Sequence, residues 1–121
     1  MPYKISWDYN TVHARYFGHV TDREVAMFSR EVQGDERFES LRYVVEDFRE
    51  CNELTYSDRV LEELSATDAA AGHTNPRIKI AVITRQQKVM EMVNAYISKG
   101  YSIYPLRHFP SPDLADRWLR S

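Results

Sequence analysis

The chain has 121 residues, of which 43% are hydrophobic and 28% are charged, and its formal net charge is −2. This composition is that of an ordinary globular domain, and it excludes a disordered, collagen-like or low-complexity chain. The weak net charge argues against a general nucleic-acid binder or a membrane-surface binder. The single cysteine can form neither an internal disulfide nor a cysteine-rich zinc site. We therefore expect residues 1–121 to form one domain.

No apolar stretch of the sequence approaches the length of a membrane span, and residues 1–8 do not resemble a cleavable signal. We expect a cytoplasmic protein with a reduced thiol and no membrane association. The charge is unevenly distributed along the chain. Residues 35–68 carry 4 basic and 11 acidic groups, whereas residues 77–121 carry 8 basic and 3 acidic groups. This asymmetry indicates either solvated helix faces of different sign or a polarised surface that orients a charged partner.

The N-terminal third of the sequence predicts two strands and a helix. Residues 4–9 and 11–17 form the strands, because Val12, Ala14 and Tyr16 alternate with polar neighbours. Gly18 is expected to end the second strand. Thr21-Asp22-Arg23-Glu24 has the pattern of a capping box, which predicts a helix that continues to Gly34.

The remaining elements alternate between strand and helix. The buried strand 41–48 is followed by a loop over residues 49–56 and a helix that ends at Gly72. The nearly apolar strand 78–84 precedes the helix 86–99, and the strand 102–109 precedes a helix capped by Ser111. Because Pro105 cannot donate to a sheet ladder, we expect the last strand to lie at an edge or to carry a bulge.

The resulting order is β-β-α-β-α-β-α-β-α. It predicts an α/β domain with about five strands in a mixed, mainly parallel sheet and four helices. The first strand should lie antiparallel to the second.

Four segments in this order resemble the small bacterial STAS-like proteins related to anti-sigma-factor antagonists, the SpoIIAA-like family. They are the segment Tyr16-Phe17-Gly18-His19-Val20-Thr21, then Arg37-Phe38 with Val44-Val45-Glu46-Asp47, then Ile80-Ala81-Val82-Ile83, and finally Phe109 with Ala115-Asp116-Arg117-Trp118-Leu119. The resemblance implies a STAS-like domain without a cofactor that docks other proteins. In such proteins a Ser or Thr at the start of the helix after the central strand is phosphorylated.

The hydroxyl groups nearest to that position are Thr55 and Ser57. The family's Asp-Ser-Ser-Gly pattern is missing, so these two residues are candidates for a phosphorylation or anion site, or simply for a helix N-cap. Acidic residues surround the segment and should repel a phosphate; they are Glu50, Glu53, Asp58, Glu62 and Glu63.

Polar residues that follow the strands form a second candidate site. Ligands of open α/β sheets gather at the carboxyl ends of the strands. We therefore expect Asp47, Arg49, Thr84 and Arg85 to share one rim, either as structural groups or as a shallow polar ligand site.

The sequence contains no constellation that is typical of an enzyme. The four histidines lack metal-ligand spacing, Cys51 lies among acids that disfavour its thiolate, and no glycine-rich phosphate loop is present. We therefore expect a protein without metal, cofactor or catalytic activity that works as a regulatory module with a protein partner, which could be a second copy. The alternative is a carrier of a small molecule or lipid, which requires an apolar pocket of roughly 300 Å³ between sheet and helices.

Overall fold

A computed structural model describes residues 2–121. It forms a single five-stranded sheet with strand order β1-β2-β3-β4-β5, in which β1 and β2 are antiparallel and all other neighbours are parallel. The elements in chain order are β1 (Tyr3–Asp8), β2 (Thr11–Thr21), α1 (Asp22–Gln33), the 3-10 turn η1 (Glu36–Ser40), β3 (Tyr43–Thr55), α2 (Asp58–Ala71), β4 (Lys79–Ile83), α3 (Gln87–Ser98), β5 (Leu106–Phe109) and α4 (Pro112–Leu119). The order and the strand directions expected from the sequence are confirmed.

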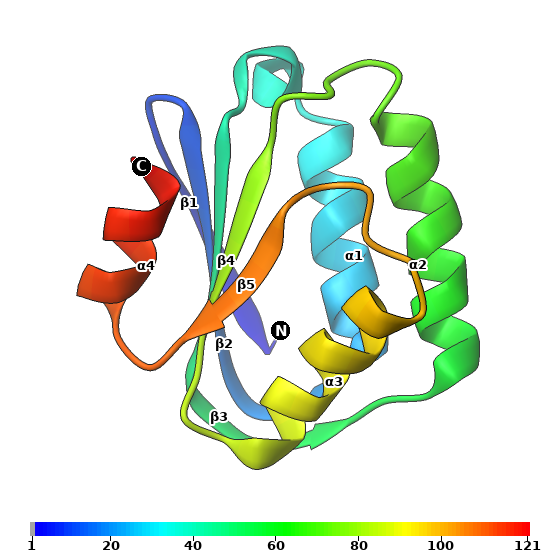
Figure 1. Cartoon of the computed structure of the whole chain (residues 1–121), viewed down its shortest axis with the longest axis vertical. Helices are drawn as coiled ribbons and strands as arrows, with labels where there is room; N and C mark the ends of the chain where they lie inside the picture. Colours follow the sequence, from blue (N-terminus) through cyan, green and yellow to red (C-terminus); the bar gives the residue numbers. More distant parts are fainter. Residues whose placement is uncertain (1) are drawn as a thin grey trace.

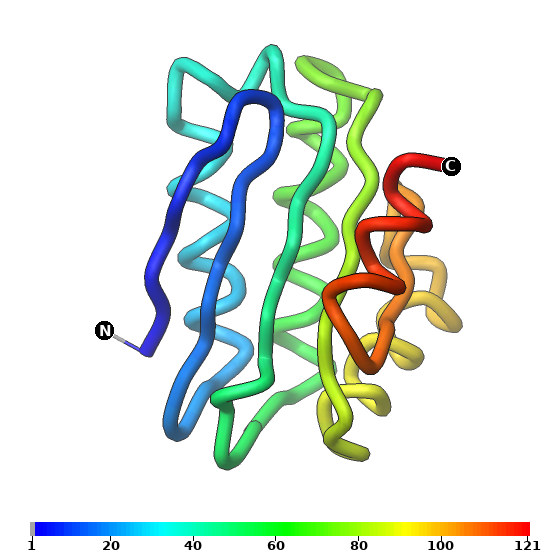
Figure 2. The backbone as a smooth tube through the Cα atoms, turned by 90° about the vertical axis from the view of Figure 1, so that its left-hand side faces the viewer, coloured from blue at the N-terminus to red at the C-terminus, as the bar shows by residue number. Residues whose placement is uncertain are grey.

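The helices divide unequally between the two faces of the sheet. Helices α1, α2 and α3 lie on one face, which we call the inner face, and α4 lies on the other, the outer face (Figure 1). Figure 2 shows that α4 lies across the β4 and β5 side of the outer face, so that no helix covers β1 and β2 there. The polar residues of β1 and β2 therefore face outward without a helix above them.

The main core lies between the sheet and helices α1–α3. Its centre is an aromatic cluster in which Tyr16 stacks on Phe48 with 4.4 Å between ring centroids, and Phe28 meets Tyr16 edge-on at 6.3 Å. Such pairs stabilise a fold by about 0.5–1.5 kcal/mol beyond the burial of their area. Alternation along β2 supplies the partners of this cluster, since Val12, Ala14 and Tyr16 are all fully buried.

The strands β2 and β3 are longer than the sequence indicates. We expected β2 to end at Gly18, but it continues to Thr21, and the register with β3 shifts between Gly18 and His19. Gly18 has a φ of +71°, a conformation that glycine adopts without strain, so it forms an irregularity inside the strand rather than its end.

The expected loop over residues 49–56 is also wrong, because β3 runs to Thr55. Acidic and polar residues of low strand propensity fill this stretch, but Cys51 and Leu54 are buried and pair with Gly18 and Val20 of β2. Pairing and burial thus override local propensity. In contrast, β5 is shorter than expected, because the strand predicted over residues 102–109 begins only at Leu106, after Pro105. It does lie at the edge of the sheet, as Pro105 suggested.

The helix starts follow the sequence signals closely. The Glu24 carboxylate accepts hydrogen bonds from the Thr21 backbone N–H and hydroxyl, both at 2.8 Å, and Ser111 caps α4 ahead of Pro112. These caps satisfy backbone donors that a helix otherwise leaves unpaired.

Helix α4 is attached to the outer face by a small apolar cluster and one lysine. Ala115 and Leu119 are buried against Val45, Ala81 and Ile83. The Lys79 ammonium donates to the carbonyl groups of Trp118, Leu119 and Ser121 at 3.3–3.4 Å. A cation at this position is stabilising, because it lies at the C-terminal end of α4, where the helix dipole is negative.

We expect Lys79→Met to loosen α4 without unfolding the sheet, because it removes the charge but keeps an apolar stem. The loss of stability should be about 1 kcal/mol. Hydrogen exchange should accelerate in residues 112–119 and not in α1. Uniform acceleration over both helices would contradict this local role for Lys79.

Candidate functional site

The start of α2 brings together the hydroxyl groups that the sequence nominated. Ser57 is the N-cap of α2, and its hydroxyl accepts a hydrogen bond from the Val60 N–H at 3.4 Å. The carboxylate of the buried Asp22, at the start of α1, accepts the Ser57 N–H at 2.8 Å. Thr55 does not cap the helix, because its hydroxyl bonds to the His19 ring at 3.0 Å. Both Ser57 and Thr55 are exposed. The hydrogen bond from the Ser57 backbone N–H to Asp22 fixes the position of Ser57 at the start of α2.

The charges around Ser57 are more balanced than the sequence suggests. Four of the five acidic residues expected to repel a phosphate have a cationic or histidine neighbour, in the pairs Arg15–Glu50, His19–Glu53, Lys99–Asp58 and Arg59–Glu63. Lys99 Nζ lies 2.5 Å from Asp58, and Lys88 lies over the Tyr56 ring at 5.3 Å. Two lysines of the α3 region therefore flank the start of α2. The sequence did not predict this arrangement, because Lys99 and Asp58 are 41 residues apart in the chain.

The four residues expected on a strand-end rim make separate sets of contacts. Asp47 lies in the middle of β3, level with Ile83, and not at the end of its strand. The Arg49 side chain donates to both oxygens of Asp47 at 2.7–3.1 Å. Partial burial raises the pKa of Asp47, but the hydrogen bonds from Arg49 outweigh this effect and hold it below its ordinary value.

The other two rim residues have contacts of their own. Thr84 is buried, and its hydroxyl accepts the Gln86 N–H at 3.0 Å at the entry to α3. Arg85 donates to the Pro110 carbonyl at 3.3 Å. Asp47 and Arg49 instead line an open polar groove of about 910 Å³ between α4 and the uncovered strands of the outer face. Asp47 and Arg49 thus contact each other, whereas Thr84 and Arg85 form hydrogen bonds in the segments before α3 and α4.

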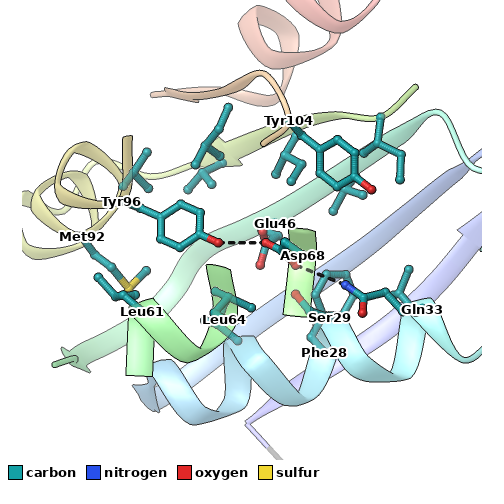
Figure 3. Close-up of a pocket in the computed structure, with 18 of the residues that line it drawn as sticks. Phe28, Ser29, Gln33, Glu46, Leu61, Leu64, Asp68, Met92, Tyr96 and Tyr104 are labelled. Atoms are coloured by element: carbon teal, nitrogen blue, oxygen red, sulfur yellow. Dashed lines mark hydrogen bonds between the residues drawn. The ribbon is translucent and has the colours of Figure 1, made fainter. Parts of the chain in front are cut away.

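A small cavity lies in the core between the sheet and helices α1–α3 (Figure 3). Its volume is about 80 Å³, and most of its lining residues are apolar. Two acidic residues also line it, Glu46 from β3 and Asp68 from α2. The Tyr16 hydroxyl donates to Glu46 Oε1 at 2.9 Å, and Asp68 accepts from the Tyr96 hydroxyl at 2.9 Å and from Gln33 at 3.2 Å.

Burial alters the protonation of both carboxyl groups. Loss of hydration raises the pKa of Glu46 to about 7; the hydrogen bond from Tyr16 lowers it and the Asp68 charge raises it. Loss of hydration likewise raises the pKa of Asp68 to about 6, against the hydrogen bonds from Tyr96 and Gln33. Both carboxyl groups should therefore take up or release a proton near neutral pH.

Sequence reasoning did not single out this carboxyl pair. A signal was present, because the alternation Val44, Glu46, Phe48 places Glu46 on the inward face of β3, and Asp68 continues the apolar stripe of Leu61 and Leu64. That the two residues line one cavity depends on the packing of α2 against the sheet.

Two classes of feature are not found among residues 2–121. No group of three or more His, Cys, Asp or Glu side chains is placed to hold a metal ion. In the same part of the chain, no helix has the length and apolar character that crossing a membrane requires.

The architecture defines an α/β domain with a mixed five-stranded sheet, and solved structures share this fold. Neither a family model nor a curated protein sequence matches the chain. The fold is nevertheless similar to that of the anti-sigma factor antagonist SpoIIAA in its unphosphorylated form, with a TM-score of 0.59 at 10% identity over 98% of both chains.

Two further structures give the same result. The phosphorylated form of the Bacillus cell fate determinant SpoIIAA matches with a TM-score of 0.60 at 10% identity, over 96% of this chain and 98% of that chain. An uncharacterized protein of the DUF3478 family with a SpoIIAA-like fold, from Shewanella loihica PV-4, matches with a TM-score of 0.55 at 12% identity over 97% and 91% of the two chains. The chain therefore has the SpoIIAA-like fold, as the sequence resemblance implied.

Proposed function

We propose that the protein is a regulatory module that binds another protein and does not catalyse a reaction. The observation that carries this proposal is the position of Ser57, an exposed hydroxyl at the N-cap of the helix that follows the central strand of a SpoIIAA-like fold. We further propose that Ser57 is the residue whose modification controls binding.

The surroundings of Ser57 suit a phosphate. A phosphate at a helix N-terminus is favoured by the unpaired N–H groups and by the helix dipole. Lys99 and Lys88 flank the site, and Lys99 could exchange its contact with Asp58 for one with the phosphate. Thr55 is the weaker candidate because His19 already engages its hydroxyl.

The direct test compares affinity capture from native cells by wild type, Ser57→Ala and Ser57→Asp, together with mass spectrometry of the native protein. We expect a phosphate on Ser57, a partner retained by Ser57→Ala, and at least tenfold weaker capture by Ser57→Asp, which equals about 1.4 kcal/mol. Ser98→Asp is the matched control, since Ser98 is exposed at the end of α3. An unmodified Ser57 combined with equal capture by all variants would refute the switch.

The inner cavity counts against the alternative function, a carrier of a lipid or of an ordinary small molecule. Its volume of about 80 Å³ is well below the roughly 300 Å³ of a site for a drug-sized ligand, and is therefore too small for a lipid. A carrier function would therefore be restricted to very small molecules. Light scattering tests the remaining expectation, that two copies associate.

A further inference from the structure

The inner cavity combines an apolar lining with two carboxyl groups that have no cationic neighbour in the described part of its wall. Its wall contains the side chains of Phe28, Leu64, Met92 and other apolar residues, together with both carboxyl groups. Among the described residues that line it, none is Lys, Arg or His. Glu46 and Asp68 are held only by neutral donors, namely two tyrosine hydroxyls and the Gln33 amide. A buried charge without a counter-ion is costly in such surroundings.

One carboxylate oxygen is free to take a ligand. The Tyr16 hydroxyl bonds to Glu46 Oε1, and within residues 2–121 the second oxygen, Oε2, receives no hydrogen bond. Every fully buried side-chain polar atom of the described chain has a partner. Glu46 keeps part of its accessible surface although three helices cover this face of the sheet, and it lines the cavity. Figure 3 shows Glu46 and Asp68 among the residues that line the pocket, and the charge of Asp68 acts on Glu46 to raise its pKa.

We propose that this cavity binds a short primary alkylammonium ion, with the ammonium group between Glu46 and Asp68 and the alkyl chain against the apolar wall. An ammonium group offers three donors and a positive charge, which matches two carboxylates that lack a counter-ion. An engineered apolar cavity of about 150 Å³ binds benzene, so about 80 Å³ suits a ligand of roughly three to five non-hydrogen atoms. The inference does not depend on the phosphorylation of Ser57.

The charge requirement makes binding depend on pH. The titratable groups that face the site are Glu46 from β3, Asp68 from α2, Tyr96 from α3, Tyr104 ahead of β5, and Tyr16 from β2 through its hydrogen bond to Glu46. Tyrosine stays protonated in the range considered, and burial raises the pKa of Tyr16 and Tyr96 further. Binding of a cation therefore displaces protons from the two carboxyl groups only. Affinity should rise by up to about tenfold per pH unit for each proton displaced, between pH 5 and 7.

The test is a titration of the full chain with n-propylammonium, followed by NMR of ¹³C-labelled methionine methyl groups. Met92 lines the cavity, and Met27 is 45% exposed on α1 and serves as an internal control. We expect a saturable shift of the Met92 signal at pH 8 and an unchanged Met27 signal. n-Propanol, which has the same size without the charge, should bind at least about tenfold more weakly, and propionate should not bind.

Variants distinguish recognition of the ammonium charge from simple filling of the cavity. Glu46→Gln and Asp68→Asn preserve size, and each should weaken binding of n-propylammonium by about tenfold or more. Glu50→Gln is the matched control on the exposed part of β3 and should bind as wild type does. Equal responses to n-propanol and n-propylammonium would overturn the proposal. So would binding that survives both core variants, a shift confined to Met27, or no saturable response at pH 8, which would mean that only water occupies the cavity.

Discussion

At pH 8, Glu46→Gln should be more stable than wild type by about 2–3 kcal/mol, and at pH 5 the two proteins should be nearly equal. The pKa of Glu46 is about 7 in the folded chain, against an ordinary value of 4.5, chiefly because burial penalises the carboxylate. Between these values the folded state binds more protons than the unfolded state, so stability falls as the pH rises through 7. Glutamine keeps the shape and an acceptor for Tyr16 without the charge.

Asp68 acts in the same direction over a lower range, because its pKa rises from 3.8 to about 6 on folding. Wild type should therefore become more stable on acidification from pH 8 to 5. The lowered pKa of Asp47 and of Asp58 works the other way, but its effect is confined to more acid solution.

The measurement is urea unfolding of wild type, Glu46→Gln and Glu50→Gln at several pH values. All other titratable groups are common to the variants, so the difference from wild type isolates Glu46. Glu50→Gln should parallel wild type, since its ion pair with Arg15 is exposed and contributes little. Parallel pH profiles of wild type and Glu46→Gln would show that Glu46 is not desolvated.

The second large effect is expected at Asn75, where replacement by alanine should cost about 2–4 kcal/mol. The buried Asn75 amide donates to the carbonyl groups of Phe38 and Leu41, both at 2.8 Å, and its oxygen accepts the Arg77 N–H at 2.9 Å. One side chain thus joins the segment before β3 to the segment before β4. Alanine leaves the Arg77 N–H without its partner and removes one of the two hydrogen bonds that each carbonyl accepts, since Phe38 keeps the Leu41 N–H and Leu41 keeps the Arg42 side chain. It also creates a small cavity.

Thermal and urea unfolding of Asn75→Ala should show this loss, with Asn52→Ala as the control, since Asn52 is exposed on β3. Asn75→Asp should be at least as damaging near neutral pH, because a carboxylate would face two carbonyl oxygens. A loss below about 0.5 kcal/mol in Asn75→Ala, similar to that of a surface residue, would mean that water replaces the amide.

Local signals in the sequence accounted for most of the architecture. The capping box at Thr21 and the Ser-Pro pair before α4 placed two helix starts, and Pro105 correctly assigned the last strand to an edge. Where the interpretation failed, at Gly18 and along residues 49–55, pairing of β2 with β3 outweighed local propensity. No window of one strand contains that information, because the stabilising partner lies some 30 residues away.

The sequence by itself determined the alternation of elements, the buried stripes and the caps, because each depends on residues a few positions apart. It also nominated Ser57, which the fold places at an exposed helix start. Only the tertiary structure decided which charges meet. It paired Lys99 with Asp58, gave Thr84 and Arg85 hydrogen-bond partners other than Asp47, and brought Glu46 and Asp68 to one cavity. Electrostatic partners are chosen by distance in space, and that distance depends on how helices of different strand connections pack on one sheet.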